Sequence, residues 1–143
     1  MYSIKSIGDG AFYGCKSLVT LKIPDKITTI GKYAFHGCEN LRDVTFGTGL
    51  TGIGDGAFYG CRNLSNLTLP DSLVYIRQKA FQYCSSLTGI TIPPTVNSIA
   101  SSAFDHCNNL ARITVAEKNP TFSSEDGVLL HKAQKSVLRC PQG

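Results

Sequence analysis

A five-residue pattern, Ala-Phe followed by two variable residues and Cys, recurs five times in this chain at a constant interval of 23 residues. A fixed period of this size is the signature of a repeat architecture, and it constrains the fold more strongly than any local propensity. The chain of 143 residues, 42% hydrophobic and 17% charged, is long enough for one folded domain. It is therefore predicted to be a single repeat domain.

Apolar residues keep the same columns in every copy, which reads L-x-x-L-x-L-P-x-x-L-x-x-I-G-x-x-A-F-x-x-C-x-x. Alternation of apolar and β-prone polar residues predicts one short strand per copy, with one buried face. These strands are expected at residues 21–23, 44–46, 67–69, 90–92 and 113–115. Pro24, Pro70 and Pro93 are expected to end three of them, because proline lacks the N–H group that continued pairing needs.

A unit of 23 residues cannot bury its apolar edge alone, but stacking places each column about 4.8 Å from its counterpart. The prediction is a right-handed solenoid with a parallel β-sheet on one face and short helical or 3-10 turns opposite. Asp9, Asp55 or Ser101 is expected to cap such a turn. The turns would carry inward a structural ladder made of Phe12, Phe35, Phe58, Phe81 and Phe104, with Cys15, Cys38, Cys61, Cys84 and Cys107.

The L-x-x-L-x-L frame resembles the leucine-rich repeat, and the wording "IP…I…IG…AF…GC" is similar to its BspA-like class. The resemblance covers residues 1–118 as five repeats. One departure from the general leucine-rich pattern is the missing Asn or Cys ladder after the strand, where Lys26, Gly49, Ser72, Thr95 and Lys118 stand instead. The resemblance implies an extracellular or cell-surface protein of anaerobic microbes that adheres to host matrix or to other cells.

Residues 119–143 depart from the repeat. Phe122 keeps the Ile column in register, so this segment is expected to begin as an altered sixth coil. Strands at 128–130 and 136–139 are expected to form a β-hairpin, which resembles a segment found in such arrays before further repeats resume. The chain also opens inside a coil without a polar capping unit, so we expect a fragment of a longer array, begun at an added Met1.

The cysteine column allows three interpretations. Reduced thiols acting as small apolar fillers are favoured, because parallel Cβ directions leave neighbouring Cβ atoms beyond the roughly 3.8 Å that a disulfide prefers. Disulfides and a row of metal thiolates are the alternatives, although zinc would want paired Cys on one loop or His at fixed offsets. No metal or cofactor is expected. Cys140 falls outside the period and is expected to be exposed.

Catalysis is not expected. His36 and His106 occupy different repeat positions, and no motif supplies them with a nucleophile. Asp9 and Asp55 would lie roughly 10 Å apart, a separation near that of an inverting glycosidase, but capping explains them more simply. The net charge of +4 comes from scattered residues, which disfavours nucleic acid as a partner. No apolar run is long enough to insert into a membrane.

Two surface stripes remain as candidate partner surfaces. One projects from the sheet and consists of Lys22, Thr45, Thr68, Thr91 and Thr114. The other follows the Phe ladder and consists of Tyr13, His36 and Tyr59, with Tyr33, Tyr75 and Tyr83 adding aromatic edges. Thr is also a common β-former, and Tyr can simply pack over a coil, so both stripes have structural alternatives. The leading hypothesis is a non-catalytic module that binds a protein or a glycan; the alternative is a structural spacer or stalk.

Overall fold

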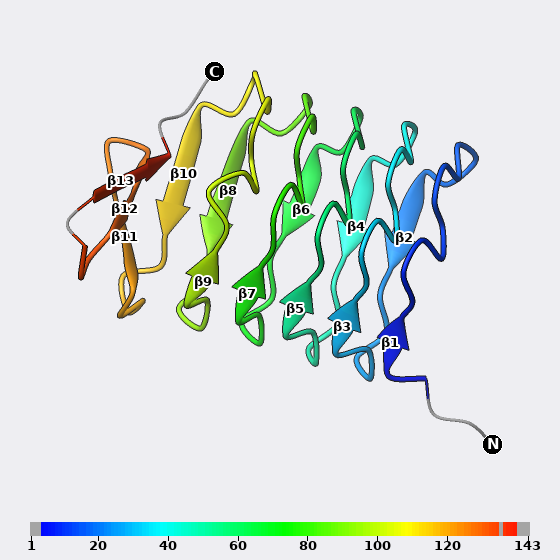
Figure 1. The fold of residues 1–143 in the computed structure, drawn as a ribbon, viewed down its shortest axis with the longest axis horizontal. Helices are drawn as coiled ribbons and strands as arrows, with labels where there is room; N and C mark the ends of the chain where they lie inside the picture. The colour runs from blue at the N-terminus through cyan, green and yellow to red at the C-terminus, as the bar shows by residue number, and fades with distance from the viewer. Residues whose placement is uncertain (1–3, 135, 140–143) are drawn as a thin grey trace.

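The chain forms a stack of coils in the computed structural model, which describes residues 4–134 and 136–139 (Figure 1). Each coil gives one strand to each of two rows that run along the stack. The first row contains β2 (Thr20–Lys22), β4 (Asp43–Thr45), β6 (Asn66–Thr68), β8 (Gly89–Ile92) and β10 (Arg112–Val115). The second row contains β1 (Ser6–Ile7), β3 (Thr29–Ile30), β5 (Gly52–Ile53), β7 (Tyr75–Ile76) and β9 (Ser98–Ile99).

Both rows are parallel, and their register follows the repeat. Leu21 pairs with Val44, and Ile30 pairs with Ile53, each 23 residues further along the chain. Side chains of one sequence column therefore lie side by side in space. The first row lies where the alternation of residues predicts strands, and each of its five strands begins one residue earlier than predicted. Its hydrogen bonds divide it into β2–β4–β6 and β8–β10.

The helical or 3-10 turns expected opposite the sheet are not found, since residues 4–134 and 136–139 contain no helix. The A-F-x-x-C segment is instead a series of turns. The amide of His36 bonds to the Tyr33 carbonyl within its own coil (3.2 Å), whereas the amide of Phe35 bonds to the Ala57 carbonyl of the next coil (2.7 Å). Because alternate amides bond outside their own coil, the hydrogen-bonding series of a helix cannot propagate.

Left-handed backbone also interrupts this segment. The residue before Cys has a positive φ in all five copies: Gly14 (70°), Gly37 (71°), Gly60 (72°), Tyr83 (62°) and His106 (58°). Glycine adopts such a conformation freely because it has no Cβ. The first three copies have glycine at this position, whereas the last two adopt the same conformation with Tyr83 and His106.

The proposed caps also have a different role. Oδ1 of Asp9 accepts a hydrogen bond from the Lys32 amide (2.8 Å), and Oδ1 of Asp55 accepts one from the Gln78 amide (3.1 Å). In each case the donor lies in the next coil, so the carboxylate links two coils and does not cap a turn of its own. Ser101 does not take part in this pattern through its hydroxyl; its neighbour Ser102 accepts from an amide of the preceding coil.

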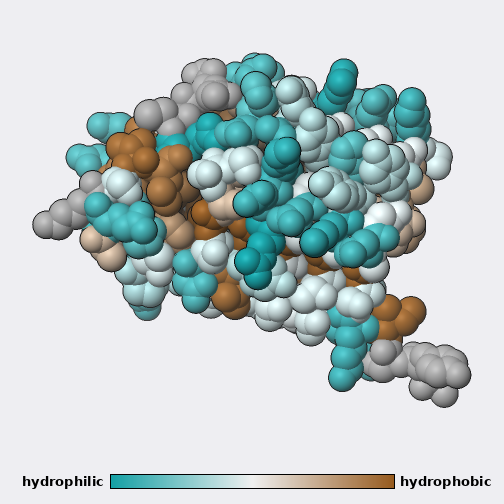
Figure 2. Space-filling view, in the orientation of Figure 1, coloured by the Kyte–Doolittle hydropathy of each residue, from teal (hydrophilic) through white to brown (hydrophobic). Residues whose placement is uncertain are grey.

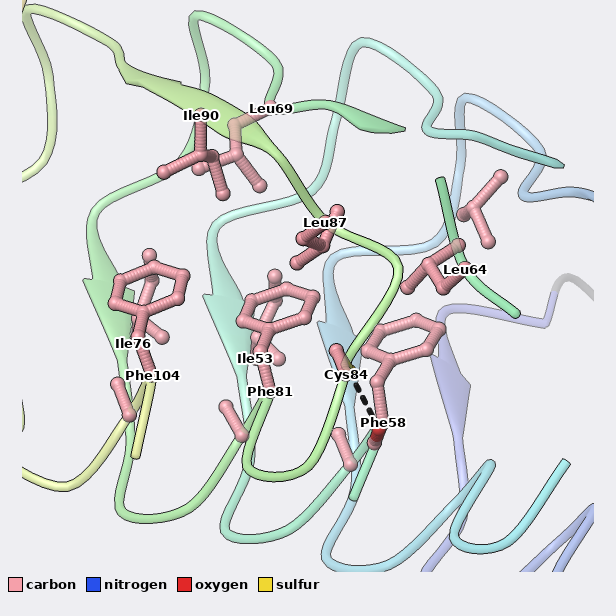
Figure 3. Packing of buried hydrophobic residues seen from close by; sticks show 14 of the residues in the cluster. Ile53, Phe58, Leu64, Leu69, Ile76, Phe81, Cys84, Leu87, Ile90 and Phe104 are labelled. Carbon is pink, nitrogen blue, oxygen red and sulfur yellow. Dashed lines mark hydrogen bonds between the residues drawn. The ribbon is translucent and has the colours of Figure 1, made fainter. Parts of the chain in front are cut away.

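The interior is a ladder of matching side chains. The five phenylalanine rings of the A-F-x-x-C segments stack nearly parallel, with centroids 5.1 to 5.6 Å apart. Figure 3 shows Phe58, Phe81 and Phe104 in this stack, beside Ile53 and Ile76 of the second row. Phe35 and Phe58 are completely buried, whereas Phe12 remains 40% exposed because no coil precedes it in the described structure.

The C-terminal segment forms a three-stranded antiparallel sheet of β11 (Phe122–Glu125), β12 (Val128–His131) and β13 (Ser136–Arg139). The two predicted hairpin strands pair with each other, and β11 adds a third strand. Arg139 ties this sheet to the fifth coil through the Asp105 carboxylate and the Ser101 carbonyl. The predicted exposure of Cys140 and the proposed start at an added Met1 concern residues that lie outside the described ones.

Candidate functional site

The cysteine column forms a regular set of hydrogen bonds. Each thiol from the second copy onward donates to the phenylalanine carbonyl of the preceding coil, at 3.0 to 3.2 Å. Figure 3 draws one of these bonds, from Cys84 to Phe58. The same carbonyl accepts the amide of the cysteine in its own coil. The thiol therefore provides a second partner for a buried carbonyl at the turn.

These thiols have little chemical reactivity in the folded state. Burial raises the pKa of Cys84 well above its ordinary value and raises the pKa of Cys107 to about 11. Burial likewise raises the pKa of Cys61. Because the thiolate is the nucleophile and the metal ligand, a raised pKa disfavours both functions. In residues 4–134 and 136–139 no three His, Cys, Asp or Glu residues gather in a metal-binding group.

The aromatic stripe expected after the Phe ladder is a real stack. The His36 ring lies between the rings of Tyr13 and Tyr59, with both centroid separations equal to 4.6 Å and interplanar angles of 2° and 4°. The repeat explains this arrangement, since the three residues occupy the same position of three consecutive coils. Tyr13 is 60% exposed, so the stack lies at the surface.

The stack continues beyond the predicted residues. Tyr83 meets Tyr59 edge to face at 5.4 Å and stacks on His106 at 4.6 Å. Tyr33 meets His36 edge to face at 5.6 Å. We call these six residues the aromatic ridge: Tyr13, Tyr33, His36, Tyr59, Tyr83 and His106.

Tyr83 and His106 shift the ridge by one sequence column. The position after Phe is aromatic in the first three copies and becomes Gln82 and Asp105 in the last two, while the next position changes from Gly to Tyr83 and His106. A search of single columns misses His106 for this reason. The available signal was the loss of glycine at a position that needs left-handed backbone, which costs about 1–2 kcal/mol for other residues.

The ridge carries hydrogen-bonding groups along its length. Burial lowers the pKa of His36, so its imidazole is neutral at pH 7. The hydrogen bonds found within residues 4–134 and 136–139 include none from the hydroxyls of the four ridge tyrosines. Those hydroxyls are therefore available to a partner.

Tyr75 belongs to a different surface from the one expected. It lies on β7 in the second row, where its ring occupies the space above Gly52, and the Arg77 guanidinium lies 4.3 Å from the ring centre. Tyr75 and Arg77 line a groove of about 680 Å³ over the second row, and Asp9 and Asp55 line this groove too. Both carboxylates are engaged by backbone amides, which gives them a structural role in place of the acid and base of a glycosidase.

The threonine stripe lies on the outer side of the first row. All five of its residues are exposed: Lys22, Thr45, Thr68, Thr91 and Thr114. Thr45 and Thr68 line a groove of about 750 Å³ over β4 and β6, together with Asp43 and Asn66. These last two residues bond to each other, with Nδ2 of Asn66 donating to Oδ1 of Asp43 at 2.6 Å. The stripe is a polar surface suited to hydrogen bonding, and it contains no aromatic residue.

Figure 2 shows the face of the molecule that is turned to the viewer in Figure 1. Hydrophilic residues cover most of it, and the larger hydrophobic patches lie near the two ends of the stack. The exposed apolar residues Ile4 and Val19 belong to the first coil, and Val137 belongs to the C-terminal sheet. None of the described residues forms a helix long and apolar enough to cross a membrane.

Short parallel strands stacked at a 23-residue period, with Leu, Phe and Cys columns turned inward, define a leucine-rich repeat solenoid. The sequence profile of the BspA type leucine rich repeat region matches residues 5–125, in six copies. The chain belongs to this family. A search of curated protein sequences gave no significant match.

Solved structures of bacterial leucine-rich repeat proteins are similar to the chain. The Treponema pallidum protein TpLRR is 37% identical over 77% of this chain and 51% of its own, with a TM-score of 0.76. A Bacteroides ovatus protein is 36% identical over 80% of this chain and 29% of its own, with a TM-score of 0.73. The pneumococcal vaccine antigen PcpA is 26% identical over 98% of this chain and 43% of its own, with a TM-score of 0.78. The chain thus spans about half or less of each of these proteins.

Proposed function

We propose that the chain is a non-catalytic binding segment of a secreted or cell-surface protein, and that it mediates adhesion through contact with a protein or a glycan. The observation that carries this proposal is the aromatic ridge, a stack at the surface in which His36 and Tyr59 are half-buried and the other four residues are exposed. Exposed tyrosines are typical of binding surfaces because they bury much area with little loss of rotamer freedom. A surface location is supported by the family and by its similarity to a vaccine antigen.

The environments of the nucleophilic and ionisable side chains favour binding over catalysis. The buried thiols are protonated and donate to carbonyl groups. Asp9 and Asp55 join neighbouring coils. His36 is held between two tyrosine rings, without a hydrogen-bonded Ser or Cys beside it in the described part of the chain. Each of these groups has a structural role that accounts for its position.

The second candidate function is a structural spacer in a larger surface protein. It is favoured by the number of bonds that join consecutive coils, such as those from the Asp9 and Asp55 carboxylates and from the cysteine thiols. Such a stack resists bending, which suits a stalk. The two candidates differ in what they require of the ridge, since a spacer needs no ligand.

A binding assay separates them. The purified chain would be applied to immobilised matrix proteins, to a glycan array and to whole cells. Tyr13→Ala combined with Tyr59→Ala is expected to reduce binding at least fivefold. Tyr75→Ala, which removes a partly exposed aromatic away from the ridge, is the matched control and should leave binding unchanged. No adhesion of the unmodified chain at 100 micromolar would favour the spacer.

A further inference from the structure

We infer that the stack contains a hinge between its third and fourth coils, where the first row of strands opens and closes while the second row stays bonded. We call the opening the row break; it lies between β6 and β8, which are neighbours in the first row (Figure 1). Bending at this place is a property of the stack itself, so it does not depend on the proposed adhesion.

The first row lacks its hydrogen-bonded ladder at the row break. The amide of Thr88 donates no hydrogen bond and the carbonyl of Ser65 accepts none within the described part of the chain. At the other three boundaries of this row the corresponding bond is present: Arg42 to Val19 (2.8 Å), Ser65 to Arg42 (3.1 Å) and Ala111 to Thr88 (2.9 Å). For this reason β6 and β8 belong to separate sheets.

The other sides of the same two coils are bonded. In the second row β5 pairs with β7, and the amide of Arg77 donates to the Ile53 carbonyl at 3.0 Å. At the A-F-x-x-C turn the amide of Phe58 donates to the Ala80 carbonyl at 2.8 Å. The second row is one sheet from β1 to β9. The bonded sides therefore form the axis about which the two halves of the stack rotate.

Gly89 explains the loss of one side-chain link at the row break. Asn66 joins the third coil to the second, because its Nδ2 donates to Oδ1 of Asp43 at 2.6 Å. Gly89 is the next member of the same sequence column, at the start of β8. Since glycine has no side chain, this row of linked side chains ends at Asn66.

Pro94 explains the loss of a second link. After β2 and β4, the amide of Thr48 donates to Oδ1 of Asp25 at 2.9 Å and so joins the first two coils. After β6 and β8, the same two columns contain Asp71 and Pro94. Proline has no amide hydrogen, so the corresponding bond cannot form. Both losses fall on the side of the stack where the ladder is missing.

Side-chain packing is also looser at the row break. Leu67 of β6 is half-buried, whereas its counterparts Val44 and Ile90 in the neighbouring coils are buried. A groove of about 430 Å³ crosses the break and is lined by Leu67 and Thr68 on one side and by Ile90 and Thr91 on the other. Opening of the break moves Thr68 away from Thr91. The hinge thus sets the curvature of the threonine stripe that a partner meets.

Amide hydrogen exchange followed by NMR tests the missing ladder. In the ¹⁵N-labelled chain, the protection factor of the Thr88 amide is expected to be at least about tenfold lower than those of the Ser65 and Ala111 amides, because only the latter two are bonded across coils. Equal protection of the three amides would overturn the inference.

Residual dipolar couplings measure the bending itself. The two halves of the stack, β1 to β6 and β7 to β12, are expected to give alignment tensors of different magnitude, because rotation about the bonded sides averages the couplings of one half relative to the other. Both halves fitting one tensor of the same magnitude would show a rigid stack and overturn the inference.

Two substitutions taken from other copies of the repeat should close the break. Gly89→Asn supplies an Nδ2 that donates to Oδ1 of Asn66, and Pro94→Thr supplies an amide that donates to Asp71. The site has room, since a Cβ at Gly89 meets nothing beyond its chain neighbours nearer than the Arg112 carbonyl oxygen at 3.7 Å. The double variant is expected to equalise the two tensors and to raise the protection of the first amide of the break at least about tenfold.

The control variant is Thr20→Asn, which places the same side chain in the same column of the first coil, away from the row break. It should leave the protection of Thr88 and the difference between the tensors unchanged. A folded double variant with the tensors of the unmodified chain, or a control that acts as strongly as Gly89→Asn, would overturn the assignment of the hinge to Gly89 and Pro94. If the double variant does not fold, Gly89→Asn alone serves, with at least about a threefold gain in protection expected.

Discussion

The cysteine side chain illustrates how a single residue supports this fold. Its sulfur fills a small space beside the Phe stack, and its proton satisfies a carbonyl oxygen of the preceding coil. Neither part of this role requires redox chemistry or a metal. The column recurs because every coil contains the same turn and therefore the same carbonyl.

Replacement of a buried cysteine should reduce stability. Cys84→Ala is expected to lower the free energy of unfolding by about 1–3 kcal/mol, since it removes packed volume and one hydrogen bond. Cys15→Ala is the control: Cys15 is only partly buried in the first coil, and a loss under about 1 kcal/mol is expected. Urea unfolding followed by circular dichroism measures both. Equal losses would contradict a role that depends on stacking between coils.

The raised thiol pKa values predict alkaline destabilisation. Folded Cys107 and Cys84 keep their protons to higher pH than unfolded cysteine, whose pKa is about 8.5. Their contribution is complete below pH 8.5 and declines as the pH rises toward about 11, because the unfolded state then loses protons first. The free energy of unfolding should fall between pH 8.5 and 10.5, and fall less steeply in Cys84→Ala. Identical slopes in the two proteins would exclude this cause.

At the scale of the element, one buried asparagine holds the C-terminal sheet. Asn119 donates from Nδ2 to the carbonyls of Pro93 and Val96, and its Oδ1 accepts from the amides of Thr121 and Phe122. It lies one residue after the column where the general leucine-rich pattern has Asn or Cys. It thus joins the start of β11 to the coil before it.

Removal of this asparagine should loosen the sheet. Asn119→Ala leaves buried backbone groups without partners, and we expect a loss of about 3 kcal/mol in the free energy of unfolding. Amides of β11 and β12 should exchange with solvent faster than those of β3 to β7. Asn109→Ala, which removes one exposed bond to the Ser85 carbonyl, is the control and should cost under about 1 kcal/mol. Uniform loss of protection along the chain would show that Asn119 does not act locally.

At the scale of the whole molecule, stability depends on position in the stack. Each coil contacts its neighbours, so a central coil buries both of its faces and the first described coil buries one. Phe58 is completely buried between two rings, whereas Phe12 has one stacked neighbour and is 40% exposed.

The same substitution should therefore have unequal effects in the two coils. Phe58→Ala is expected to cost about 3–5 kcal/mol, as for a buried aromatic, and Phe12→Ala about 1–2 kcal/mol. Hydrogen exchange in the unmodified chain should be fastest in the first coil for the same reason. Comparable costs for the two variants would mean that the coils unfold as one unit with no dependence on position.

The repeat period predicts most of the fold, because residues 23 apart that share a chemical type are neighbours in a stack. It places β2, β4 and β6 within one residue and places the Phe and Cys side chains in adjacent columns. It does not predict the second row of strands, since two residues such as Thr29 and Ile30 are too few to show alternation. The prediction of a helical turn was wrong, because alternate amides of this segment bond to the next coil. Local sequence carries no information about such partners.

The repeat alone establishes that this chain stacks, with what period, and which side chains turn inward, because burial requires the same apolar columns in every coil. It also placed Tyr13, His36 and Tyr59 in one stripe. The folded coordinates were needed to show that the thiols donate to Phe carbonyls and that Tyr83 and His106 continue the ridge from a neighbouring column. These features depend on backbone direction at left-handed residues, which sets where a side chain projects and is invisible in a column of letters.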